Sequence, residues 1–97
     1  MIIETRTNTL KHNLKRIELT PKETKLILLL SDNEFHRIRE IRKYVGFITD
    51  IQTRLLINKL NKYTKEKLNL KIISKRTNKH GLTGLDLYKI NRIIYIS

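Results

Sequence analysis

The stretch from Leu19 to Lys79 decides the fold that this sequence predicts. It reads LTPKETKLILLL at 19–30, FHRIREIRKYVG at 35–46, TDIQTRLLINKLNKY at 49–63 and LKIISKRTNK at 70–79. The first three segments have the apolar spacing of helices, and the fourth has the β-branched character of a strand. The sequence therefore predicts an α+β fold in which three helices precede a β-hairpin.

The first helix has a strong start signal. Thr20 can accept a hydrogen bond from the amide of Glu23, and the Glu23 carboxylate can accept one from the amide of Thr20. Pro21 occupies the first helical position, where no amide is needed. We expect a helix from Pro21 that ends at residues 31–33, and the apolar run 26–30 predicts that it is the buried central helix.

A glycine separates the second and third predicted helices. The second helix has apolar residues at steps of three and four, namely Phe35, Ile38, Ile41 and Tyr44 or Val45. Gly46 supplies a left-handed stop. Thr49 and Gln52 repeat the capping pattern, so the third helix is expected to begin at Asp50 and to run to about Lys65.

Two faces are predicted for this third helix. The core stripe comprises Thr53, Leu56, Ile57, Leu60 and Tyr63. The opposite side gathers Arg54, Asn58, Asn61, Lys62 and Lys65. In a DNA major groove, arginine can offer two donors to guanine, and asparagine can pair with the edge of adenine. We therefore expect Arg54, Asn58 and Asn61 to read bases, with the two lysines on phosphates.

The same polar residues would also furnish an ordinary solvated helix face, and two apolar residues complicate the assignment. Ile51 and Leu55 lie at the edge of the proposed DNA side. They fit contact with thymine methyl groups, with a second protomer, or with the core of a helix rotated from the expected position.

β-strands are expected on both sides of the helices. Residues 1–19 predict two or three short antiparallel strands with a turn at 12–13. Residues 70–97 predict a hairpin and a final strand at 93–96, which pairs with the hairpin or offers an edge to a partner. An apolar content of 39% is enough for one modest core, so residues 1–97 are expected to form a single domain with its three-helix core at 20–65.

The tip of the expected hairpin, residues 75–80, carries three fixed positive charges. Lys75, Arg76 and Lys79 suit contact with phosphates or insertion into a minor groove. The alternative is a solvated lysine-rich loop.

Positive charge dominates the sequence and increases toward its second half. Lysine and arginine number 21 against 9 aspartates and glutamates, which gives a net charge of +12 at pH 7. Residues 51–80 include nine basic residues and one acidic residue, Glu66. Such an excess is tolerated more readily when the partner is a polyanion.

The sequence offers little for catalysis or for a metal, cofactor or small-molecule site. Cysteine is absent, and His12, His36 and His80 lack the spacing of a metal site. We therefore expect a non-enzymatic protein without a cofactor. No apolar run approaches the roughly 20 residues of a membrane span, and no signal peptide is evident, so a cytoplasmic protein is expected. Isoleucine, lysine and asparagine are abundant, which indicates an AT-rich coding sequence. A bacterial, phage or plasmid origin is therefore expected.

With these elements placed, the chain resembles the winged helix-turn-helix effector domain of OmpR/PhoB-type response regulators. The matching segments are Leu19-Thr20-Pro21-Lys22-Glu23, the leucines at 28–30, a second helix that ends at Gly46, and Ile57-Asn58-Lys59-Leu60. The resemblance implies a small antiparallel sheet before the first helix, a recognition helix and a C-terminal β-hairpin wing.

Three departures from that family stand out. The recognition helix of the family carries more arginine near its centre, where this chain has Leu55, Leu56 and Asn58. Its wing normally closes with a glycine-aromatic pair, whereas this chain has leucine after both Gly81 and Gly84. A chain of 97 residues cannot hold a receiver domain beside this fold, so we expect no control by aspartate phosphorylation if the chain is complete.

The sequence therefore predicts a sequence-specific double-stranded DNA-binding protein, most simply a transcriptional regulator. Helix 50–65 would read the major groove, and the 75–80 wing would contact the backbone or the minor groove. Two alternatives stay open. One is a plasmid or phage replication initiator, and the other is a winged-helix module that binds a protein partner or a second copy of itself.

Overall fold

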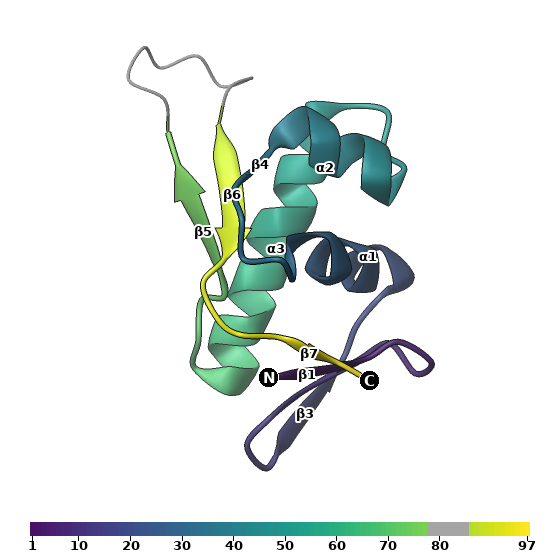
Figure 1. Ribbon diagram of the computed structural model, residues 1–97, viewed down its shortest axis with the longest axis vertical. Coiled ribbons are helices and arrows are strands. Elements are labelled where there is room, and N and C mark those ends of the chain that lie inside the picture. Colours follow the sequence, from purple (N-terminus) through teal and green to yellow (C-terminus); the bar gives the residue numbers. More distant parts are fainter. Residues whose placement is uncertain (78–85) are drawn as a thin grey trace.

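The structure is a computed structural model that describes residues 1–77 and 86–97. Over these residues the chain has an α+β architecture with three helices and two small sheets (Figure 1). The helices are α1 (Pro21–Leu30), α2 (Ile38–Val45) and α3 (Asp50–Leu68). The strands are β1 (Ile2–Glu4), β2 (Thr9–His12), β3 (Lys15–Glu18), β4 (His36–Arg37), β5 (Ile73–Arg76), β6 (Leu87–Ile90) and β7 (Tyr95–Ile96).

Local capping signals set the helix starts as expected. Thr20 caps α1 with a complete capping box to Glu23, and Thr49 does the same for α3 with Gln52. Gly46 ends α2 with a φ of +93°, a left-handed conformation that glycine adopts without a Cβ clash. The start of α1, both capping boxes and the glycine stop are therefore confirmed.

Two helix boundaries differ from the prediction. Helix α2 begins at Ile38, because His36 and Arg37 pair as β4 with β6, and this leaves Phe35 outside the helix. Helix α3 continues past Lys65 to Leu68, where Asn69 ends it in the left-handed region with a φ of +58°. The longer α3 buries Leu68, an apolar residue that the predicted core stripe did not include.

The N-terminal sheet has the strand order β3-β2-β1-β7. The β2–β3 hairpin turns after His12, as predicted, and its antiparallel pairs run from Thr9↔Glu18 to His12↔Lys15. The final strand does not pair with the hairpin, which was one of the two outcomes expected for it. It comprises Tyr95–Ile96 and lies parallel to β1 in the register Ile2↔Tyr95, at the edge of the sheet. Figure 1 accordingly shows both termini side by side at the end of the molecule away from α2.

The second sheet has the strand order β4-β6-β5 and is antiparallel throughout. Strands β5 and β6 form the expected hairpin, with pairs from Ile73↔Ile90 to Arg76↔Leu87. The short strand β4 was not predicted, because two residues carry too little alternation to be recognised. It ties the segment between α1 and α2 to the hairpin.

Buried apolar side chains come from all three helices and both sheets. The core consists of Ile3, Leu10, Ile17, Leu19, Leu26, Ile27, Leu30, Ile38, Ile41, Val45, Ile57, Leu60, Leu68, Ile72, Ile73, Tyr88, Ile90 and Ile94. Helix α1 contributes three fully buried residues to it, whereas Leu28 and Leu29 are only partly buried. The helix is thus central, as predicted, but it is not buried on all sides.

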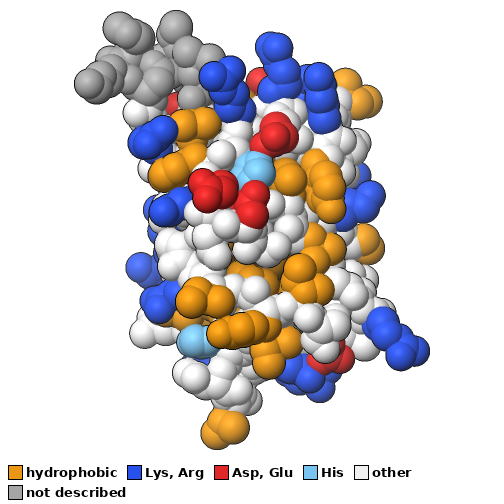
Figure 2. Space-filling model, viewed as in Figure 1, with side chains coloured by type: hydrophobic (Ala, Val, Ile, Leu, Met, Phe, Trp, Pro, Cys, Tyr) orange, Lys and Arg blue, Asp and Glu red, His pale blue; other side chains and the backbone are white. Residues whose placement is uncertain are grey.

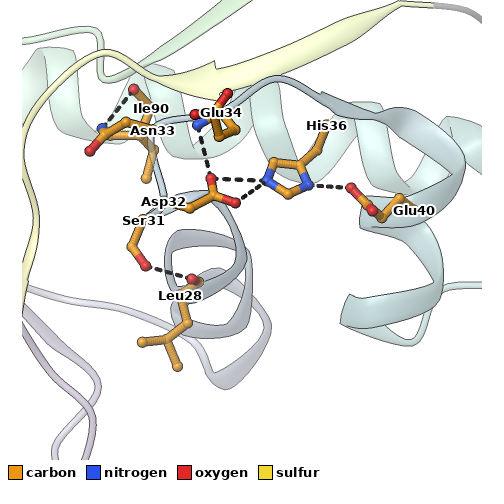
Figure 3. A network of polar contacts seen from close by, with 8 residues as sticks. All are labelled: Leu28, Ser31, Asp32, Asn33, Glu34, His36, Glu40 and Ile90. Atoms are coloured by element: carbon orange, nitrogen blue, oxygen red, sulfur yellow. Dashed lines mark hydrogen bonds and ion pairs between the residues drawn. The ribbon is translucent and has the colours of Figure 1, made fainter.

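Acidic side chains gather around one histidine on the face drawn in Figure 2, with lysines and arginines at its margins. Figure 3 resolves this cluster, in which the ring of His36 lies between two carboxylates. Its Nε2 is 2.8 Å from Oδ2 of Asp32, and its Nδ1 contacts Oε1 of Glu40. Because Asp32 follows α1 and Glu40 lies in α2, the imidazole links these two helices through β4.

The two carboxylates change the titration of this histidine, whose side chain is only 12% exposed. Burial by itself lowers the pKa of His36, but the hydrogen bonds and charges of Asp32 and Glu40 outweigh burial and raise it above 6.5. Burial likewise raises the pKa of Asp32, yet the amide of Glu34 and the ring of His36 hold it below 3.8. Asp32 and Glu40 therefore clamp the ring of His36 and favour its protonated form.

We expect this clamp to make stability depend on pH. The His36 contribution is fully present below its unfolded pKa of 6.5 and is lost as pH rises through the raised pKa of the folded protein. The Asp32 contribution is present above pH 3.8 and is lost as pH falls through its lowered pKa. Urea unfolding of the wild type and His36→Gln at pH 5.5 and pH 9 should show a larger difference at pH 5.5. An equal difference at both pH values would rule the clamp out.

Candidate nucleic-acid interface

The buried stripe of α3 decides which of its side chains can meet a partner. It consists of Thr53, Ile57, Leu60, Thr64 and Leu68. Thr53, Ile57 and Leu60 were predicted, whereas Leu56 and Tyr63 are only half-buried. Helix α3 is therefore rotated about its own axis relative to the prediction. The predicted polar face does not point directly away from the core, but lies roughly 75° around the helix from that direction.

The most exposed side of α3 is a different row of residues. Ile51, Leu55, Asn58 and Lys62 follow one another at steps of four, three and four, and all four are exposed. We call these four residues the outward stripe. Two predicted site residues, Asn58 and Lys62, belong to it. Lys65 is also exposed, while Arg54 is half-buried and lies closer to the core side.

Asn61 has a structural role that excludes the base contact predicted for it. Its Nδ2 donates to the carbonyl oxygen of Ile73 at 3.0 Å, and its Oδ1 accepts from the amide of Ile73 at 2.9 Å. Both polar atoms of the side chain are thus engaged with β5. No sequence pattern indicates this role, because the partner is a backbone group twelve residues away that only the fold brings near.

The basic residues predicted on the wing are partly engaged within the protein. Lys75 Nζ lies 3.2 Å from Oδ2 of the buried Asp86, and the guanidinium of Arg76 lies 4.5 Å from the ring centroid of Phe35. These contacts fix the root of the hairpin and leave Arg76 exposed at its surface. Lys79 lies outside the described residues.

Residues of α3 and of the β5–β6 hairpin together line a hollow of about 150 Å³. Its lining includes Asn58 from α3, Lys75 from β5, and Lys71 from the segment between them. Sequence reasoning did not name Lys71 or Lys59 as site residues, although both are exposed and basic. Their charge was the available signal, but charge alone does not show on which side of a fold a lysine lies.

The turn between α2 and α3 is held by side chains from both helices. The Arg42 guanidinium donates to the carbonyl oxygen of Ile48 at 2.9 Å and lies 3.4 Å from Oδ1 of Asp50. Gln52 Oε1 accepts from the amides of Ile48 and Thr49, at 3.2 Å each. These bonds orient the first turn of α3 relative to α2.

Most carboxylates are occupied within the protein. Glu23 and Asp86 are buried, and three others surround or adjoin His36. Glu4 pairs with Lys11, whose hydrogen bond is the main cause that lowers the pKa of the Glu4 carboxyl. Asp50 pairs with Arg42, whereas Glu18, Glu23 and Glu66 line a hollow together with Lys59 and Lys62 of α3.

Within 1–77 and 86–97, no group of three or more histidine, cysteine, aspartate or glutamate side chains is arranged to hold a metal ion. In that part of the chain, no helix is both long and apolar enough to cross a membrane.

We expect Asn61→Ala to lower the free energy of unfolding and Asn58→Ala to leave it nearly unchanged. Removal of the Asn61 amide leaves the buried Ile73 backbone without its partner, which costs about 1–3 kcal/mol of unfolding free energy. Asn58→Ala, at an exposed position of the same helix, should change stability by less than about 0.5 kcal/mol. Urea denaturation of both variants measures the difference, and equal stabilities would contradict the structural role of Asn61.

Comparisons with protein-family models, curated proteins and solved structures gave no match to this chain.

Proposed function

We propose that this chain is a winged helix-turn-helix protein that binds double-stranded DNA, with α3 in the major groove. The order of elements supports the fold assignment. Residues 46–49 join α2 to α3, which fits the three- or four-residue, glycine-containing turn of helix-turn-helix motifs. The β5–β6 hairpin follows α3, at the place of a wing.

One observation carries the functional proposal: the exposed flank of α3 is rich in lysine, although Glu18 and Glu66 lie near Lys59 and Lys62. Lys59, Lys62 and Lys65 are exposed within two turns of this helix. These lysines contribute to the net charge of +12 on 97 residues, which ion pairs within the protein do not cancel because it already counts every carboxylate. A surface of this kind attracts a polyanion and accelerates association with it.

The dimensions of α3 suit the major groove. Its 19 residues span about 28 Å, and the groove is about 12 Å wide, enough for one helix. In this arrangement the N-terminal half of α3 meets base edges, with Asn58 as the adenine-reading candidate. Lys62 and Lys65 contact phosphates. Arg54 is half-buried and lies beside this face of the helix, closer to the core.

The wing contributes a second set of phosphate contacts. Arg76 is exposed on β5, and Lys75 is 47% exposed despite its ion pair with Asp86. Both lie on the strand that Asn61 fastens to α3, so helix and hairpin approach the duplex as one unit. Lys79 extends this basic set toward the hairpin tip in sequence.

A protein-interaction module is the second candidate, because several apolar side chains are exposed. On α3 these are Ile51 and Leu55, and near the C-terminus they are Ile93, Tyr95 and Ile96. Tight binding to a folded protein, without duplex affinity beyond that of any cation, would favour this candidate. A replication initiator would share the DNA-binding surface and would differ in target, an origin repeat instead of a promoter.

The salt dependence of duplex binding tests the proposal. We expect the logarithm of the binding constant to fall linearly with the logarithm of salt concentration, by roughly 0.9 per phosphate contact. Loss of two contacts in a Lys62→Gln, Lys65→Gln double variant should flatten the slope by about 1.8. Fluorescence anisotropy with a labelled random-sequence duplex at four salt concentrations measures both slopes.

Lys25→Gln is the control for this experiment. Lys25 is also exposed but lies on α1, which contributes no residue to the proposed interface, so its removal should leave the slope unchanged. Equal slopes for the wild type and the double variant would remove α3 from the interface. Absence of any salt-dependent duplex binding by the wild type would refute DNA binding.

A further inference from the structure

The first half of the outward stripe is apolar. Ile51 is 67% exposed and Leu55 63% exposed, and Ile48 in the preceding turn is 82% exposed. Single exposed apolar residues are ordinary on a protein surface. These three differ because they fall within eight residues at the start of α3, and the two helical ones occupy adjacent turns of one stripe.

The polar surroundings of these residues indicate what covers them. Along the stripe the apolar pair is followed by Asn58 and Lys62, and Lys59 is exposed beside them. A second copy of a chain that carries +12 would meet this lysine-rich flank with further positive charge, which is unfavourable. The positive charge of this flank complements an anionic partner. A DNA duplex is such a partner, and its major groove also offers apolar groups to Ile51 and Leu55.

The apolar group of the major groove is the C5 methyl of thymine. A guanine or cytosine edge offers hydrogen-bonding groups there instead, and contact with isoleucine or leucine would desolvate those groups without a partner. The outward stripe holds no arginine that could satisfy a guanine, since Arg54 lies off it. Asn58, the next residue along, matches the edge of adenine.

We propose that Ile51 and Leu55 read thymine methyl groups, so that this chain selects duplex sites with A·T pairs under the first two turns of α3. The inference rests on the DNA-binding function proposed above and adds the base class that the protein recognises. Specificity then comes from apolar contact with methyl groups beside one asparagine, rather than from arginine on guanine.

Selection from a random duplex pool, followed by thymine-to-deoxyuridine substitution in the selected site, tests this inference. Deoxyuridine keeps the base pair and lacks only the methyl group. Each contacted methyl should contribute about three- to fourfold in affinity, the factor that corresponds to ~0.8 kcal/mol. The wild type should weaken by this factor at the contacted positions, and an Ile51→Ala, Leu55→Ala double variant should bind both duplexes equally.

Leu14→Ala serves as the matched control. Leu14 is fully exposed in the β2–β3 turn, and its replacement should leave the deoxyuridine effect intact. Thermal unfolding of every variant checks that the fold is retained. Because the substituted positions on α3 and in the turn are exposed, little change in stability is expected.

The outcomes distinguish failure of this inference from failure of the proposed DNA-binding function. A selected consensus with a deoxyuridine effect that vanishes in the double variant supports the inference. A selected consensus without that effect, or with an effect that the double variant retains, overturns the inference and leaves DNA binding in place. Failure to select any sequence, together with salt-independent duplex affinity, overturns both. A protein partner that binds wild type but not the double variant, without a deoxyuridine effect, also overturns the inference.

Discussion

The pair of hydrogen bonds between Asn61 and the backbone of Ile73 is the constraint on which the proposed interface depends. It joins α3 to β5 at a point where β5 is already buried, and so it fixes the helix and the hairpin in one orientation. With Thr53, Ile57 and Leu60 on the core side, this attachment determines which row of α3 faces outward. Buried polar groups that are fully paired define one arrangement more strictly than apolar contact does.

Charge is distributed in a way that serves both folding and binding. Most carboxylates cap α1, clamp His36, or pair with Lys11, Arg42 and Lys75, so they stabilise local structure. Glu18 and Glu66 instead lie near Lys59 and Lys62 of α3. The remaining lysines repel one another, which lowers the free energy of unfolding. In the proposed complex, a polyanion would relieve that repulsion, so the excess positive charge that destabilises the free protein would stabilise its complex.

Sequence reasoning succeeded where the determining groups are neighbours in the chain, and it failed where they are not. Both capping boxes and the Gly46 stop depend on residues within three or four positions, and all were predicted. The parallel β1–β7 pairing and the Asn61 bonds join distant segments, and no local pattern indicates them. The rotation of α3 was missed because Leu56 and Tyr63 look like core residues, whereas Thr64 is the one that is buried, with its hydroxyl bonded to the carbonyl oxygen of Asn61.

The parallel pairing of β1 with β7 joins segments that are far apart in the sequence. The amide of Tyr95 donates to the carbonyl oxygen of Met1, and the amide of Ser97 donates to that of Ile3. Contacts of such long sequence separation carry a large loop-closure entropy, so this pairing is expected to form late in folding. The helices and the β5–β6 hairpin do not depend on it through any strand pairing. The proposed interface can therefore form before the N-terminal sheet is complete.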